Sequence, residues 1–130
     1  MVEEVIADGK RIARLLSSEV HGHERGALAR LDVADAAEAV EPTEAGTYAY
    51  AVRADDDRRV ADVAVHPDRC RVEVRAAVEA AAAAGQRQGL RVRATATDPS
   101  RTLVFVENGA QVKPALRVLR AVGEALDDAG

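Results

Sequence analysis

Strict alternation of apolar and polar residues between positions 90 and 97 constrains the fold of this chain more than any other feature. Every second residue there is apolar, and the residues between are arginine or threonine, in the run LRVRATAT. Successive side chains of a strand point to opposite faces of its sheet, so we predict a strand with one buried and one exposed face. Because such strands are typical of antiparallel sheets, the pattern favours a largely antiparallel sheet.

Other segments complete the predicted sheet. A short strand is expected over residues 27–33, and residues 47–52 and 59–65 read as a hairpin across the Asp55-Asp56-Asp57 turn. The run from Arg71 to Arg75 alternates as a strand does, which we favour over a helix beginning at Pro67, where proline would suit the first helical position. Residues 103–106 read LVFV without alternation, so we expect this strand to be central and covered on both faces.

Three helices are expected beside the sheet. Apolar residues recur at helical spacing over residues 2–18, with Gly22 and Gly26 ending the helix. An alanine-rich helix is expected over residues 76–84, with Gly85 as its stop. A C-terminal helix follows Asn108-Gly109 and tolerates Pro114 in its first turn. We therefore predict one α+β domain over residues 1–130, whose terminal helices cover one face of the sheet.

The composition of the chain indicates the cellular compartment and the type of organism in which it works. The chain carries 22 acidic against 18 basic side chains, for a net charge of −4. It has no apolar run of 18 residues and no basic, apolar leader, so we expect a cytoplasmic protein without a membrane partner. Cys70 is the only cysteine, which suits a reducing compartment. The acidic excess, with many arginines and few lysines, is typical of proteins from salt-adapted archaea.

Residues 86–120 form a basic segment in this acidic chain, with seven cations against Asp98 and Glu107. We expect some of these cations on two exposed lines, one on the polar face of the 90–97 strand and one on the final helix. The candidate anion- or nucleic-acid-binding residues are Arg91, Arg93, Lys113, Arg117 and Arg120. If the two lines are adjacent they would bind phosphates, RNA or an acidic protein; the alternative is simple pairing with surface carboxylates. No aromatic residue interleaves these arginines in sequence.

Catalytic and metal-binding motifs are not found. His21, His23 and Glu24, with His66 and Cys70, match no closed zinc spacing, so we predict neither a metal site nor a cofactor. The serines lack a nucleophile-elbow setting, and neither a P-loop nor a GxGxxG stretch occurs. We therefore assign no catalytic residue.

Two segments or sets of segments in the sequence resemble known protein families. The run ADVAVHPDRCRVEVRAAVEAAAAAG, residues 61–85, resembles the acetyl-CoA-binding strand, loop and helix of GNAT acetyltransferases, but it lacks their glycine-rich pyrophosphate loop, and we reject the likeness. The opening MVEEVIADGKRIARLL, the stretch GALARLDVADA and the block TDPSRTLVFVENGAQVKPAL resemble a small haloarchaeal family of unknown function. That resemblance implies a cytoplasmic protein of a salt-rich organism and transfers no active site.

Three classes of function follow. We favour a non-enzymatic binding or assembly module, which a self-pairing sheet edge or helix face would make a homo-oligomer. The second class is an RNA- or anion-binding module that uses the five candidate cations. The third is a small enzyme or ligand-binding protein that uses His66 and Cys70, or a pocket near Tyr48 and Tyr50.

Overall fold

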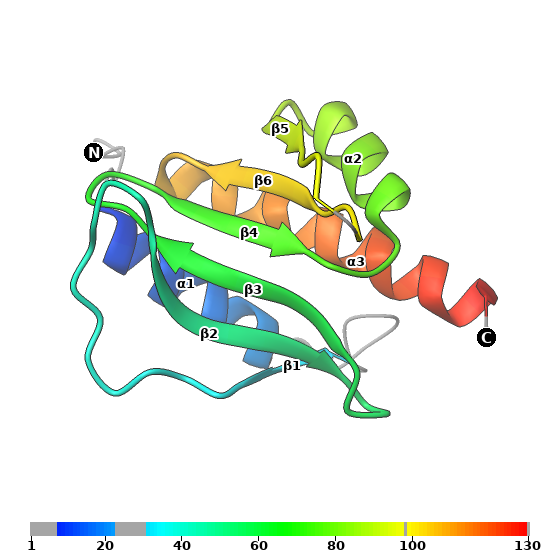
Figure 1. The fold of residues 1–130 in the computed structure, drawn as a ribbon, viewed down its shortest axis with the longest axis horizontal. Helices are drawn as coiled ribbons and strands as arrows, with labels where there is room; N and C mark the ends of the chain where they lie inside the picture. The colour runs from blue at the N-terminus through cyan, green and yellow to red at the C-terminus, as the bar shows by residue number, and fades with distance from the viewer. Residues whose placement is uncertain (1–7, 23–30, 98, 130) are drawn as a thin grey trace.

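The computed structural model describes residues 8–22, 31–97 and 99–129. In these ranges the chain forms a six-stranded sheet and three α-helices, which confirms the α+β class (Figure 1). The elements are α1 (Gly9–Gly22), β1 (Leu31–Ala34), β2 (Thr47–Ala54), β3 (Arg59–Val65), β4 (Cys70–Val74), α2 (Val78–Arg87), β5 (Arg91–Ala94), β6 (Thr102–Val106), the 3₁₀ turn η2 (Gly109–Gln111) and α3 (Val112–Ala129).

The strands are ordered β1-β2-β3-β4-β6-β5, and every neighbouring pair is antiparallel, as the alternating sequence pattern predicted. The predicted hairpin is present as β2 and β3. A second turn leads into β4, closed by a hydrogen bond from the His66 amide to the Arg69 carbonyl, so residues 70–74 form a strand rather than a helix. The first strand begins at Leu31, and residues 27–30 of the expected strand lie outside the described ranges.

All three helices pack on one face of the sheet and bury a single apolar core. The terminal helices therefore cover one face of the sheet, as predicted. In Figure 1, α1 and α3 lie behind the sheet. Ile12, Leu16 and Val20 give α1 a stripe at helical spacing, and each is no more than 1% exposed. The Tyr50 hydroxyl donates a hydrogen bond of 2.7 Å to the Ala13 carbonyl, which ties β2 to α1 through the core. Among the described helices, none is long and apolar enough to cross a membrane.

The expectation for residues 103–106 is wrong in two respects. β6 is the fifth strand of six, and described helices cover only one of its faces. Val104 and Val106 point into the core, whereas Leu103 and Phe105 lie on the other face, where Leu103 is half-buried and Phe105 is 9% exposed. The Arg91 side chain, not a second layer of described helices, lies over Phe105 on that face, so an apolar residue is tolerated there.

The predicted end of the middle helix is also wrong. Helix α2 runs from Val78 to Arg87, so Gly85 lies inside it. The backbone of α2 at Gly85 packs closely against β5, because a Cβ at Gly85 would lie 2.5 Å from Val92 Cγ2. The turn glycine is instead Gly89, whose φ of +75° suits glycine. The first turn of α3 contains Pro114, as predicted.

Candidate functional site

The five predicted cations do not share one surface. Arg91 pairs with Phe105 across β5 and β6, and Arg93 pairs with Leu103, so both arginines lie on the face of the sheet opposite the helices. The other three predicted cations, Lys113, Arg117 and Arg120, are exposed on the outer side of α3, in the helical layer. The Arg117 guanidinium donates to Gln88 Oε1 at the end of α2. The two basic lines therefore belong to opposite sides of the molecule.

Further arginines from outside the predicted set join Arg91 and Arg93. We define the arginine face as the part of the uncovered sheet face formed by β3, β4, β6 and β5. Its arginines are Arg59, Arg71, Arg75, Arg91, Arg93 and Arg101, and its carboxylates are Asp62, Glu73 and Glu107. Six arginines against three carboxylates give this face a local charge of +3 in a chain of net charge −4. Four of these arginines were missed because they come from segments with balanced local charge or from turn positions.

Two carboxylates organise the centre of the arginine face. Asp62 accepts from Arg59 Nε at 2.7 Å and from Arg75 Nε at 2.8 Å. Glu73 accepts from Arg71 Nη2 at 2.7 Å and from Arg101 Nη1 at 3.1 Å. The Asp62 side chain is only 12% exposed, so its pairs are less screened than ordinary surface ion pairs. The network holds four guanidinium groups over the sheet and fixes their orientation.

Aromatic rings interleave the arginines in space, although not in sequence. Phe105 lies between Arg71 and Arg91 in the strand register. The Arg91 guanidinium carbon is 4.9 Å from the Phe105 ring centroid, and that of Arg59 is 5.6 Å from the Tyr48 ring centroid. Two of the chain's three aromatic side chains therefore lie on the uncovered face. Sequence spacing did not predict this, because the residues meet through strand pairing.

The outermost end of the arginine face is the most accessible. The Arg91 side chain is 61% exposed and forms an ion pair with Glu107 at 3.2 Å. Arg93 is exposed and has no ion pair with any residue in the described ranges. These two guanidinium groups are therefore the ones most available to an external anion.

His66 and Cys70 do not form a joint site. Cys70 packs in the apolar core, where burial raises the pKa of its thiol to about 12. The imidazole of His66 contacts the Glu44 carbonyl through Nδ1 at 2.9 Å and Arg71 Nη1 through Nε2 at 3.1 Å. Because arginine can only donate, Nε2 accepts and the proton lies on Nδ1. Burial is the main cause that lowers the pKa of His66.

No group of three or more metal-ligating side chains comes together in the part of the chain that the structure describes. Of the other metal candidates, His23 and Glu24 lie outside the described residues.

The loop that contains Gly46, at φ +95°, packs closely against His66. A Cβ at Gly46 would lie 3.1 Å from His66 Cε1. His66 thus acts as a link between that loop and Arg71.

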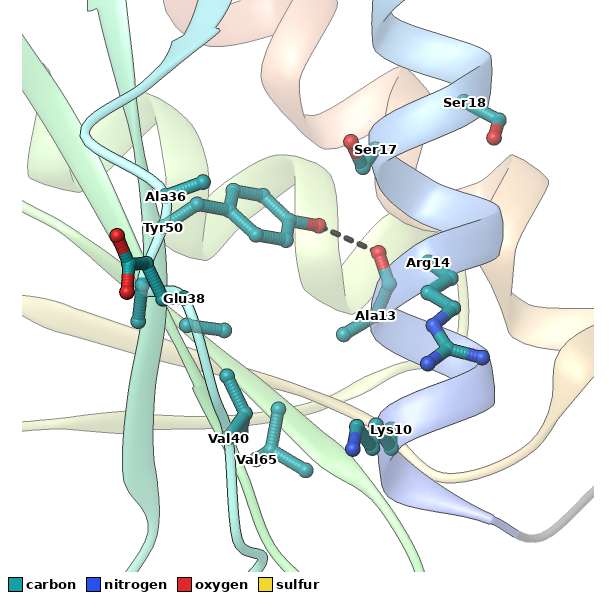
Figure 2. Close-up of a pocket in the computed structure, with 12 residues that line it drawn as sticks. Lys10, Ala13, Arg14, Ser17, Ser18, Ala36, Glu38, Val40, Tyr50 and Val65 are labelled. Carbon is teal, nitrogen blue, oxygen red and sulfur yellow. Dashed lines mark hydrogen bonds between the residues drawn. The ribbon is translucent and has the colours of Figure 1, made fainter.

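The two tyrosines named for a pocket point to opposite faces of β2. A register shift lies between Tyr48 and Tyr50, so Tyr50 faces α1 while Tyr48 lies with the arginines. Tyr50 lines a cleft of about 450 Å³ between α1 and the segment that follows β1 (Figure 2). Burial raises the pKa of its hydroxyl, which stays neutral and donates to Ala13.

Comparison with known proteins gives a family but no activity. A family model with the description "Family of unknown function (DUF7993)" matches residues 1–130. No curated protein and no solved structure matches the chain. The expected membership of a family of unknown function is thus confirmed, and the archaeal origin stays a prediction.

Proposed function

We propose that this chain, which belongs to the DUF7993 family of unknown function, is a non-enzymatic binding module that holds single-stranded RNA on its arginine face. The observation that carries the proposal is the local charge of +3 on an uncovered sheet face of an otherwise acidic chain. A polyanion is attracted to that face even though the chain as a whole is acidic.

The chemistry of the face suits phosphate and bases together. All of its cations are arginine, whose planar fork can bind phosphate through two hydrogen bonds and whose plane can stack on a base. Tyr48 is 36% exposed and offers a ring for stacking. An open antiparallel sheet leaves room for unpaired bases that a folded duplex does not present.

Accessibility assigns roles within the face. Arg91 and Arg93 would contact phosphates, since Arg91 is 61% exposed and Arg93 is exposed without an ion pair among the described residues. The four arginines held by Asp62 and Glu73 would supply a positive floor of fixed geometry. A strand laid across the sheet would run from β5 towards Tyr48.

A matched pair of double variants tests the proposal. Arg91→Ala/Arg93→Ala removes two charges from the arginine face, and Lys113→Ala/Arg120→Ala removes two from α3. Affinity for a fluorescein-labelled 12-nucleotide RNA is measured by anisotropy at several salt concentrations. We expect the first variant to bind about tenfold more weakly and to lower the salt slope by about 1.4, at about 0.7 per phosphate contact on a single strand. The second variant should bind as the parent does.

The outcomes are decisive in both directions. Equal losses in the two variants would mean that only net charge matters, and undetectable binding at every salt concentration between 50 mM and 2 M KCl would overturn the proposal. A duplex RNA of the same length separates stacking from charge: we expect it to bind more weakly, because its bases are not available to Tyr48. Tighter duplex binding would contradict the role of the aromatic side chains.

Self-assembly is a second candidate, favoured by the position of β5 at the end of the sheet. Its outer edge has no partner strand in the described ranges, and such an edge can pair with a second copy. The strand has only four residues and carries Arg91 and Arg93, features that discourage edge pairing. Light scattering would decide this, and a dimer that survives in the Arg91→Ala/Arg93→Ala variant would favour assembly.

We also propose that the protein works in a salt-rich cytoplasm of an archaeon. The excess of acidic over basic side chains supports this setting. In molar salt the Debye length is about 3 Å, so repulsion between exposed carboxylates farther apart than that is largely screened. The free energy of unfolding should rise between 0.1 and about 2 M KCl. A fall over that range would contradict the proposed setting.

A further inference from the structure

A second surface feature lies on the helical side of the sheet, away from the arginine face. The cleft beside Tyr50 has a volume of about 450 Å³, within the range of small-molecule sites. Helix α1 forms one wall and residues 36–40 form the other, with β2 and β3 beneath (Figure 2). The elements that form it are therefore distinct from those that present Arg91 and Arg93.

The floor of the cleft is apolar. It is formed by the Tyr50 ring and by the small aliphatic side chains Ala13, Val40, Ala49 and Val65. Ala13, Ala49, Tyr50 and Val65 are each at most 6% exposed, so the floor is continuous with the core. The Tyr50 hydroxyl already donates to the Ala13 carbonyl, which leaves the floor suited to an apolar ligand body.

The mouth of the cleft is cationic. Lys10 and Arg14 stand one helical turn apart on α1, beside the cleft in Figure 2. Neither side chain has an ion pair or a hydrogen bond with a residue in the described ranges, in contrast to most arginines of the sheet. Glu38 lies on the opposite wall, but its carboxylate points away from α1 in Figure 2. The mouth therefore offers two positive charges, unpaired among the described residues, next to an apolar floor.

We infer that this cleft binds a small organic anion, a monocarboxylate with a compact apolar body. The carboxylate would lie between Lys10 and Arg14, and the apolar body would lie on Tyr50 and Val65. This arrangement pairs both cations and removes the ligand's apolar surface from water at the same time. The inference is independent of RNA binding, because it uses no residue of the arginine face.

A titration followed by ¹H–¹⁵N NMR tests the site with defined probes. Hexanoate and phenylacetate are the anionic probes, and hexanol and hexylamine have the same apolar body as hexanoate with a neutral or cationic end. We expect saturable shifts for the amides of Ala13, Val40 and Tyr50 with the two carboxylates. Hexylamine should give no saturable shift, since its ammonium would face Lys10 and Arg14.

Variants separate charge at the mouth from charge on the helix. Arg14→Gln should weaken hexanoate binding about fivefold to tenfold by removing one charge-assisted contact. Arg11→Gln is the matched control, because Arg11 is exposed on the same helix and does not line the cleft. We expect the control to bind hexanoate as the parent does.

Three results would overturn the inference. These are equal binding of hexanol and hexanoate, equal losses in the Arg11→Gln and Arg14→Gln variants, and no saturable shift with either carboxylate at 10 mM. Loss of fold is excluded by the spectrum itself, because dispersed amide signals from β3 and β4 report the intact sheet. RNA anisotropy on the Arg14→Gln variant keeps the two sites distinguishable, since we expect it to be unchanged.

Discussion

Asp62 and Glu73 stand directly opposite each other on β3 and β4, two carboxylates in one registered pair. Like charges in this position repel and destabilise a sheet. Each carboxylate is instead held between two arginines, so the pair forms the centre of a network with four cations. The structure therefore converts a repulsive pair into the element that positions the arginine face.

Removal of Asp62 should destabilise the fold. Asp62→Asn leaves Arg59 and Arg75 without their shared carboxylate, but both arginines are about one-third exposed and can turn to water. We expect a loss of about 1–2 kcal/mol in the free energy of unfolding, measured with urea. Asp55→Asn is the control, since Asp55 is exposed in the β2–β3 turn and should change stability by less than about 0.5 kcal/mol. Equal effects would show that the network contributes nothing.

Gly85 should resist substitution although it lies inside a helix. Alanine favours helix over glycine by about 1 kcal/mol, but its Cβ would lie 2.5 Å from Val92 Cγ2. Because Val92 is short and branched it cannot move aside, and overpacking costs about 1–3 kcal/mol. We expect Gly85→Ala to lower the melting temperature and Gly85→Ala/Val92→Ala to recover part of the loss. A melting temperature raised by Gly85→Ala alone would contradict this packing.

The same residue shows what local sequence could and could not predict. Periodicity found the hairpin, the strand at residues 70–74 and the final helix, because each follows from alternation or helical spacing over neighbouring residues. Gly85 was misread as a helix end, since its reason is a neighbour on β5 that no local pattern reveals. β6 was misplaced for the same reason: an unbroken apolar run does not distinguish a helix layer from arginine side chains on its second face.

The candidate site was less predictable than the fold. Arg91 and Arg93 were identified from alternation alone, and both lie on the exposed side of β5 as expected. The sequence could not show whether Arg91 and Arg93 share a surface with Lys113, because this depends on which side of the sheet α3 covers. Phe105 and Arg71 are 34 positions apart and become neighbours only through the pairing of β4 with β6. Contacts across strands therefore determine this surface.

Cys70 should be unreactive in the folded protein. Its side chain is fully buried, and burial raises the pKa of the thiol to about 12, so the thiolate that reacts is scarce at pH 8. We expect no labelling by a disulfide reagent on the minute scale and one equivalent of label in denaturant. Labelling rates at intermediate urea should then follow opening of the core. Rapid labelling without urea would contradict the packing of β4.

His66 should make the fold weaker in mild acid. Burial and the nearby cations Arg69 and Arg71 lower its pKa, so the unfolded chain takes up a proton at a pH where the folded protein does not. The contribution of His66 to the free energy of unfolding is therefore fully present above the pKa of histidine in the unfolded chain, about 6.5. It is lost as the pH falls below that value. Protonation would also place a second donor against Arg71 Nη1, where Nε2 now accepts.

The variant His66→Asn isolates the contribution of His66 from that of the other histidines in the chain. Urea unfolding at pH 7.5, 6.5 and 5.5 should show a steeper fall for the parent than for the variant, because only the parent carries the buried imidazole. Asp68 acts on the pKa of His66 in the opposite direction, and Asp68→Asn should therefore steepen the fall. Parallel curves for the parent and His66→Asn would assign the pH dependence to other groups, and the link between His66 and Arg71 would then contribute nothing to it.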